Sequence, residues 1–101
     1  MKLTVAERLI LLGLLPKEGN FTMIKLVREL RENLSFTEKE HKALEFNNTD
    51  GNITWKETVQ PKDIQIGEVL TIEIKGILKK MDEEKKLTEQ VLTLYEKFME
   101  V

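Results

Sequence analysis

The sequence contains no cysteine, which excludes disulfide bonds, thiolate catalysis and zinc sites built on thiolates. It also has a single histidine, His41, and a single serine, Ser35, and its five glycines are scattered one by one. A transition-metal site would need a second imidazole or thiolate, a serine nucleophile would need its characteristic turn, and a phosphate-binding loop would need clustered glycines. The sequence therefore predicts a protein that is not an enzyme and uses no cofactor.

A strong charge of one sign and a long hydrophobic run are missing as well. The 16 basic and 18 acidic side chains give a net charge of -2. The most apolar stretch, Leu9–Leu15, is far shorter than the ~20 residues that span a bilayer. Glu7 and Arg8 interrupt the approach to this stretch, and Pro16 follows it without a small-residue cleavage site, so we expect no secretory signal. The expected compartment is the cytoplasm, with no membrane partner.

What is present is typical of a soluble domain. Of the 101 residues, 41% are hydrophobic and 34% charged, and no repeat or linker divides the chain, so residues 1–101 are expected to form one domain. The Leu9–Leu15 stretch has no polar side, and a helix of this kind must be covered by the rest of the fold, by a second copy or by a membrane. We expect the fold to cover most of it, with self-association as the alternative.

Helix signals occur along much of the sequence. Thr4 with Glu7, and Thr37 with Glu40, have the spacing of capping boxes, which predicts a helix through the apolar run and a short helix ending near Ala43. Apolar residues spaced by three and four predict further helices over residues 22–33, over 67–81 and after Thr88.

A β-hairpin is predicted between the third and fourth helices, at about residues 45–57. The polar residues 47–52 form a dense turn signal, and residues 53–56 alternate apolar with polar side chains. Ile64 and Ile66 alternate in the same way and favour a short third strand. The expected fold class is α+β, a mostly helical single domain of about five helices with a small inserted β-hairpin.

The residues of this hairpin also resemble an EF-hand calcium loop. With Gly51 at the sixth position of the loop, Asn48, Asp50 and Glu57 occupy ligand positions. The first ligand position is Phe46, however, and Pro61 follows where the second helix of an EF-hand should run. The pattern favours a hairpin turn and leaves calcium binding as an alternative.

Three helices followed by a hairpin resemble winged-helix domains, which implies nucleic-acid binding. The third predicted helix begins Glu38-Lys39-Glu40-His41-Lys42, and the basic residues of the other helices also have acidic neighbours. Such mixed charge is typical of a solvated face, so nucleic-acid binding is the second alternative rather than the favoured function.

Two blocks, residues 7–21 and 86–98, resemble small functionally uncharacterised proteins of bacteriophages and prophages. The resemblance implies a phage origin and, by analogy with small accessory phage proteins, a role in binding a host protein, a phage protein or a second copy of the chain. No site residue follows from it. We expect the interaction surface at the hairpin, with Asp50, Ile53 and Trp55 as contact residues, or at leucines of the first helix that the monomer leaves exposed.

Overall fold

The apolar run forms helix α1, and local signals determine both of its ends. In a computed structural model that describes residues 1–49, 51–56 and 60–99, α1 spans Val5–Leu14. The Glu7 N–H donates to Thr4 Oγ1 at 3.2 Å and the Thr4 N–H donates to Glu7 Oε1 at 2.9 Å, which confirms the predicted capping box. Leu15 is extended because the ring of Pro16 disfavours helical geometry in the residue before it.

The remaining helices lie where the sequence predicts them, from apolar spacing or, for the short third helix, from its capping box. They are α2 (Phe21–Leu34), α3 (Glu38–Leu44), α4 (Glu68–Glu83) and α5 (Glu89–Met99). Helix α2 begins one residue before the predicted start because the Asn20 side chain caps it, accepting from the Met23 N–H at 2.8 Å. Thr37 and Glu40 form the second predicted capping box at the start of α3.

The predicted hairpin is present between α3 and α4 and is shorter than expected. Its antiparallel strands are β2 (Asn47–Thr49) and β3 (Asn52–Thr54), and Asn48 lies opposite Ile53. Gly51 in the turn has φ 80°, a value that glycine adopts without strain. The near strand does not begin at Glu45, because that residue ends α3 in a left-handed conformation (φ 49°) and the chain is still turning there.

A second two-stranded sheet joins the start of the chain to the segment before α4. Strand β1 (Lys2–Leu3) pairs antiparallel with β4 (Lys62–Asp63), and the Ile64 N–H donates to the Met1 carbonyl at 2.8 Å. The prediction of a strand at Ile64–Ile66 is therefore wrong in position. The strand β4 has only two residues and so shows no alternating pattern, and its partner β1 lies far away, near the beginning of the sequence.

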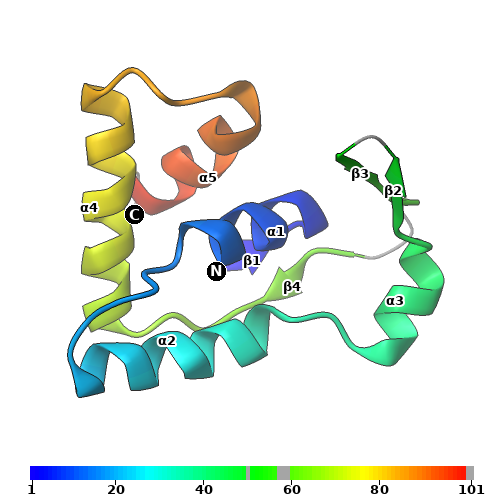
Figure 1. Ribbon diagram of the computed structural model, residues 1–101, viewed down its shortest axis with the longest axis horizontal. Coiled ribbons are helices and arrows are strands. Elements are labelled where there is room, and N and C mark those ends of the chain that lie inside the picture. The colour runs from blue at the N-terminus through cyan, green and yellow to red at the C-terminus, as the bar shows by residue number, and fades with distance from the viewer. Residues whose placement is uncertain (50, 57–59, 100–101) are drawn as a thin grey trace.

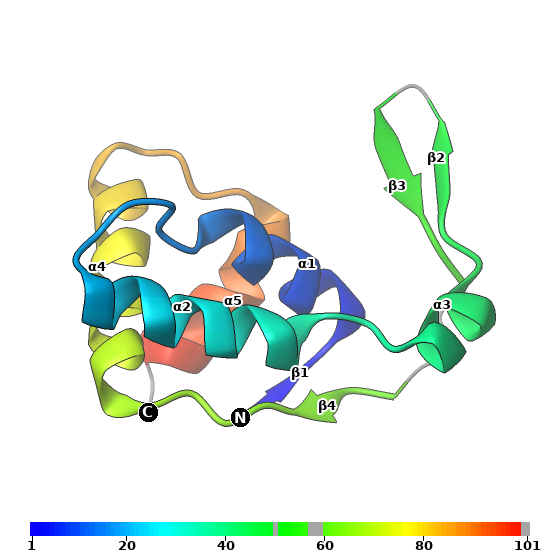
Figure 2. The same cartoon turned by 60° about the horizontal axis from the view of Figure 1, so that its bottom comes forward.

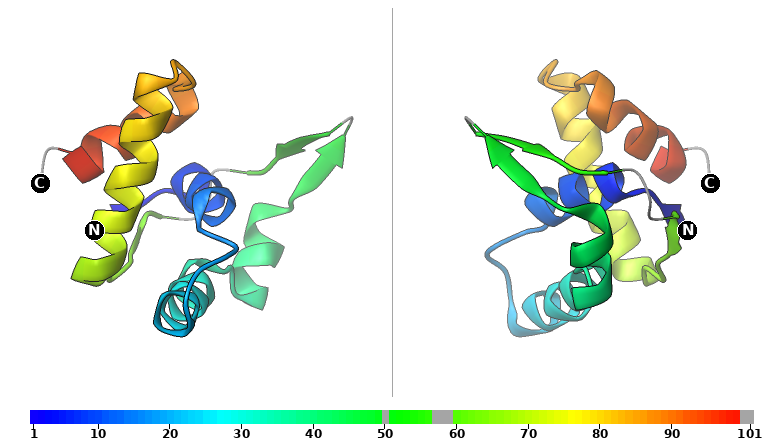
Figure 3. Two further views of the ribbon diagram at one scale, coloured as in Figure 1. Left: turned by 60° about the vertical axis from the view of Figure 1, so that its left-hand side comes forward. Right: turned by 90° about the vertical axis from the view of Figure 1, so that its right-hand side faces the viewer.

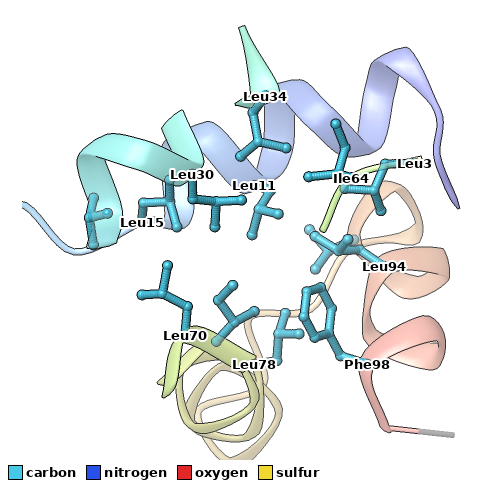
Figure 4. Packing of buried hydrophobic residues seen from close by; sticks show 13 residues of the cluster. Leu3, Leu11, Leu15, Leu30, Leu34, Ile64, Leu70, Leu78, Leu94 and Phe98 are labelled. Atoms are coloured by element: carbon cyan, nitrogen blue, oxygen red, sulfur yellow. The ribbon is translucent and has the colours of Figure 1, made fainter. Parts of the chain in front are cut away.

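Helix α1 lies at the centre of the fold, between α2 on one side and α4 and α5 on the other (Figure 1). Figure 4 shows Leu11 of α1 among side chains from these helices, together with Leu3 of β1 and Ile64, which directly follows β4. The buried core consists of Leu3, Leu11, Leu15, Val27, Leu30, Leu34, Ile64, Leu70, Ile74, Leu78, Val91, Leu94 and Phe98. Aliphatic burial of this kind is the main stabilising force of the domain.

The fold covers most, but not all, of the apolar run. Leu11 and Leu15 are buried, whereas Ile10, Leu12 and Leu14 are half-buried against the core, and Gly13 is exposed. The inner side of α1 is thus covered by the rest of the monomer, as predicted. Among the described residues, no helix is long and apolar enough to cross a membrane.

Residues 36–49 and 51–56, which include α3 and the hairpin strands, form an arm that stands away from the helical core (Figures 2 and 3). The radius of gyration is 14.0 Å, against about 13 Å for a compact chain of this length. Leu44 of the arm is fully buried but is not part of the main core cluster. The arm is therefore a small satellite with its own packing.

Candidate interaction site

A buried arginine of α1 joins the arm to the core. Arg8 is only 1% exposed, and its Nε donates to the Leu34 carbonyl at 3.1 Å while Nη2 donates to the Ser35 carbonyl at 2.8 Å. These carbonyls belong to the end of α2, where helix geometry leaves carbonyls without intrahelical partners. Nη1 donates to Glu40 Oε2 on α3 at 2.7 Å. One side chain thus connects α1, the end of α2 and the arm.

The same ion pair controls the protonation of Glu40. The hydrogen bond from Arg8 lowers the pKa of the Glu40 carboxyl from 4.5 to about 2, and this effect outweighs the opposing effect of burial. The Thr37 N–H, which donates to Glu40 Oε1 at 2.9 Å, lowers the pKa further. Glu40 is therefore ionised at neutral pH and is committed to the joint and to the cap of α3.

Glu7, which directly precedes Arg8 on α1, forms an ion pair with the helical core instead. Glu7 is buried, and Lys97 of α5 donates from Nζ to Glu7 Oε1 at 2.6 Å. Burial raises the pKa of Glu7, but the hydrogen bonds from Lys97 and the Thr4 N–H together outweigh it, so the pKa lies below its usual value. The consecutive residues Glu7 and Arg8 thus connect α1 to opposite ends of the molecule.

A row of aromatic rings extends from this joint into the arm. The Arg8 guanidinium lies 4.0 Å from the centroid of the Phe36 ring, a cation–π contact. Phe36 makes an edge-to-face contact with Phe46 at 5.3 Å between centroids, and Phe46 makes another with Trp55 at 6.2 Å. His41 contacts both phenylalanines, at 6.0 and 5.5 Å. These contacts give the arm a defined shape without a large aliphatic core.

The base of the hairpin is tied back to α3. The Lys56 N–H donates to the Leu44 carbonyl at 2.7 Å, and Lys56 Nζ pairs with Glu45 Oε2 at 2.5 Å. The hydrogen bond from Glu45 raises the pKa of Lys56. The hairpin is therefore held at its base, while its strands extend outward.

A hollow of about 270 Å³ lies between the arm and the outer side of α1. It is lined by Leu9, Phe36, His41, Phe46, Asn47, Asn48 and Ile53. Ile53 on β3 is 49% exposed, although it is a large hydrophobic residue. The hollow is smaller than the roughly 300 to 1,000 Å³ of a usual small-molecule site, and its apolar lining suits one or two inserted side chains.

The structure places the predicted contact residues as follows. Ile53 lines the hollow, and Trp55, which is half-buried, contacts Phe46 in its wall. Leu9 of the first helix, which is half-buried, also lines the hollow. Asp50 lies outside the described residues. The sequence pattern therefore predicts the hairpin of the arm but not the hollow beside it.

Of the three predicted calcium ligands, Asn48 is the one that lies among the described residues. Asn48 lies on β2 opposite Ile53, whereas Asp50 and Glu57 lie outside the described residues. Within residues 1–49, 51–56 and 60–99, no group of three acidic or histidine side chains could hold a metal ion. Residues 55, 56 and 60–67, where an EF-hand would continue into a helix, are not helical. Calcium binding therefore stays an untested prediction.

The joint and most of the hollow have no local signal in the sequence. Arg8 is expected to be exposed like most arginines, and nothing in its neighbours signals that it meets Glu40. Phe36 directly precedes Thr37, the N-cap residue of α3. An apolar residue at this position often packs against the helix, so the position of Phe36 is a signal that could identify it as a packed residue. Phe46, which the calcium-loop pattern places at the first ligand position, forms the centre of the aromatic row.

Comparisons of the chain with protein-family models, with curated proteins and with solved structures give no match.

Proposed function

We propose that this chain is a non-enzymatic interaction protein that binds an apolar segment of a protein partner in the hollow beside the arm. The observation that carries the proposal is the half-exposed Ile53 in an aromatic-lined hollow, on an arm that extends from the helical core. Apolar anchors that enter well-packed pockets supply most of the affinity in protein interfaces. The lining favours a partner that inserts leucine, isoleucine, methionine or phenylalanine side chains.

Several further features support binding rather than chemistry. Glu40 is committed to Arg8, Glu45 is paired with Lys56, and His41 packs between two aromatic rings. These commitments leave a mainly apolar surface around the imidazole. The phage origin and the cytoplasmic location predicted from the sequence are part of the same proposal, because accessory phage proteins act on partners inside the host cell.

The test compares two aspartate substitutions at similarly exposed sites. Ile53→Asp alters the hollow, while Leu92→Asp alters α5, where the leucine is 45% exposed. Proteins captured from the native host by the immobilised wild type should be retained by Leu92→Asp and lost with Ile53→Asp. Equal capture by all three proteins would contradict the proposal, and so would equal loss with both substitutions.

A direct binding measurement follows once a partner is captured. The chain contains one tryptophan, Trp55, whose ring contacts the wall of the hollow. Titration with the partner should therefore change tryptophan fluorescence, with the same saturation point as an independent binding measurement. A partner that binds without changing this signal would occupy another surface.

A further inference from the structure

The two walls of the hollow belong to different parts of the molecule. Leu9 lies on α1 in the helical core, whereas the other lining residues, among them Phe36, His41 and Ile53, belong to the arm. The distance between the two walls therefore depends on how the arm is oriented relative to α1.

Packing between helices and strands does little to fix this orientation. Within the described residues, α3, β2 and β3 do not pack extensively against any helix or strand of the core. The chain enters the arm through Ser35, an extended residue that ends α2. Residues at the ends of elements are common hinges between bodies that move relative to one another. The arm therefore needs a contact other than helix packing to hold it beside α1.

Arg8 supplies such a contact at the hinge. Its guanidinium lies against the Phe36 ring and donates to both oxygens of Glu40, at 2.7 and 3.4 Å. An arginine that holds both carboxylate oxygens fixes their geometry as well as their charge. Arg8 directly precedes Leu9, and Glu40 directly precedes His41, so the ion pair joins the chain segments that carry the two walls.

We propose that Arg8 is the positioning residue of the hollow: its pair with Glu40 holds the arm against α1, and the closed pair and a bound partner segment stabilise one another. When the pair opens, the arm turns about Ser35 and its wall separates from Leu9. The affinity then falls in proportion to the fraction of molecules whose arm is closed. By linkage, the partner favours the closed arm by the same factor. The coupling to a partner rests on the function proposed above, whereas the positioning of the arm does not.

The first experiment measures the orientation of the arm without a partner. Because the chain has no cysteine, Asn52→Cys on β3 and Gln90→Cys on α5, both at exposed sites, can be spin-labelled selectively. Pulsed electron paramagnetic resonance should give one narrow distance distribution for this labelled protein and a broader one when Arg8→Met is added. Arg28→Met, at an exposed arginine of α2, is the control and should leave the distribution narrow. An unchanged distribution with Arg8→Met would overturn the proposal.

A second variant separates a displaced arm from an unfolded one. Glu40→Gln removes the charge of the pair, while the amide oxygen can still accept from the Thr37 N–H and cap α3. Near-ultraviolet circular dichroism of Trp55 reports whether the arm stays folded. With this signal unchanged, the distribution should still broaden, and Glu38→Gln at an exposed acid of α3 should not broaden it.

Two results with Glu40→Gln would overturn the positioning role. One is a narrow distance distribution in a folded arm, because the pair would then not determine the orientation. The other is loss of the Trp55 signal, because the pair would then be needed for the arm to fold rather than for its orientation.

The last experiment tests the coupling to binding. The probe is the protein fraction from the native host that the wild type retains and Ile53→Asp does not. Arg8→Met should bind it roughly tenfold more weakly, in agreement with the fraction of closed arms in the distance distribution. Arg8→Lys should be intermediate, because an ammonium group keeps the charge but not the two-pronged geometry. Adding the probe to labelled Arg8→Met should narrow its distribution.

The outcomes separate the two proposals. Unchanged affinity in a variant whose distance distribution has broadened would overturn the coupling, although Ile53→Asp abolishes binding. If no protein fraction depends on Ile53, the proposed function fails, and the distance measurements alone decide whether Arg8 positions the arm.

Discussion

The helical core and the arm are stabilised by different kinds of contact. The core contains leucine, isoleucine and valine side chains and the fully buried Phe98, packed from four helices and the β1–β4 sheet. The arm depends on edge-to-face aromatic contacts, on Leu44 and on a short hairpin. The core buries its inward-facing side chains and leaves Phe21, Val69, Ile72 and Leu92 exposed on its surface, whereas the exposed Ile53 of the arm lines an apolar hollow. The hollow, and not exposure alone, is the reason to look for recognition on the arm.

The largest expected difference between the two regions comes from truncating one aromatic residue in each. Phe98→Ala should reduce the free energy of unfolding by about 3 to 5 kcal/mol, because it leaves a cavity in the core. Trp55→Ala should cost only about 1 to 2 kcal/mol, since the ring is half-buried. Urea denaturation followed by far-ultraviolet circular dichroism measures both values. A cost for Trp55→Ala as large as that for Phe98→Ala would contradict the weaker packing of the arm.

Removing the joint should uncouple the two regions. Arg8→Met keeps an unbranched side chain but leaves the Leu34 and Ser35 carbonyls and the Glu40 carboxylate without their partner. We expect a loss of about 3 kcal/mol, and unfolding of the arm at a lower denaturant concentration than the core. Fluorescence of Trp55 reports on the arm, and helical circular dichroism reports mainly on the core. The exposed Arg28→Met serves as control and should change neither curve by more than about 0.5 kcal/mol.

Acid should weaken the same joint. The pKa of Glu40 is lowered from 4.5 to about 2 in the folded protein, so its contribution is complete above pH 4.5 and is lost as the pH falls from 4.5 to 2. The shift corresponds to about 2 to 3 kcal/mol, allowing for the 17% exposure of the side chain. Unfolding measured across this pH range should show the loss. Glu40→Gln should flatten that part of the profile, and an unchanged profile would remove Glu40 as its cause.

The smallest expected effect concerns the turn of the hairpin. Gly51→Ala places a Cβ atom on a residue with φ 80°, which costs about 1 to 2 kcal/mol. Because the strain lies at the tip of the arm, Trp55 fluorescence should respond while the helical signal stays constant. Gly13→Ala in α1 is the matched control and should stabilise the protein by about 0.5 to 1 kcal/mol. An equal response of both signals to Gly51→Ala would show that the hairpin and core unfold together.

Much of the fold could be predicted because its signals are local. The two capping boxes, the spacing of apolar residues in α2 and α4, and the turn around Gly51 all depend on residues a few positions apart. The short β1–β4 sheet could not be predicted in this way, since each strand has two residues and the partners are distant in sequence. Of the candidate site, Ile53 and Trp55 follow from the alternating hairpin pattern, while Leu9 and Phe36 reach the same place only through the packing of α1 and α3.

The sequence by itself determined the helices, the position of the hairpin and the absence of any disulfide, because these depend on residue types and on short-range hydrogen bonds. The tertiary structure alone decided what the polar and apolar residues of α1 contact. Glu7 and Arg8 are adjacent in sequence, yet one pairs with Lys97 in the core and the other with Glu40 in the arm. Long-range ion pairs of this kind have no periodic signal, since their partners are brought together only when the helices pack.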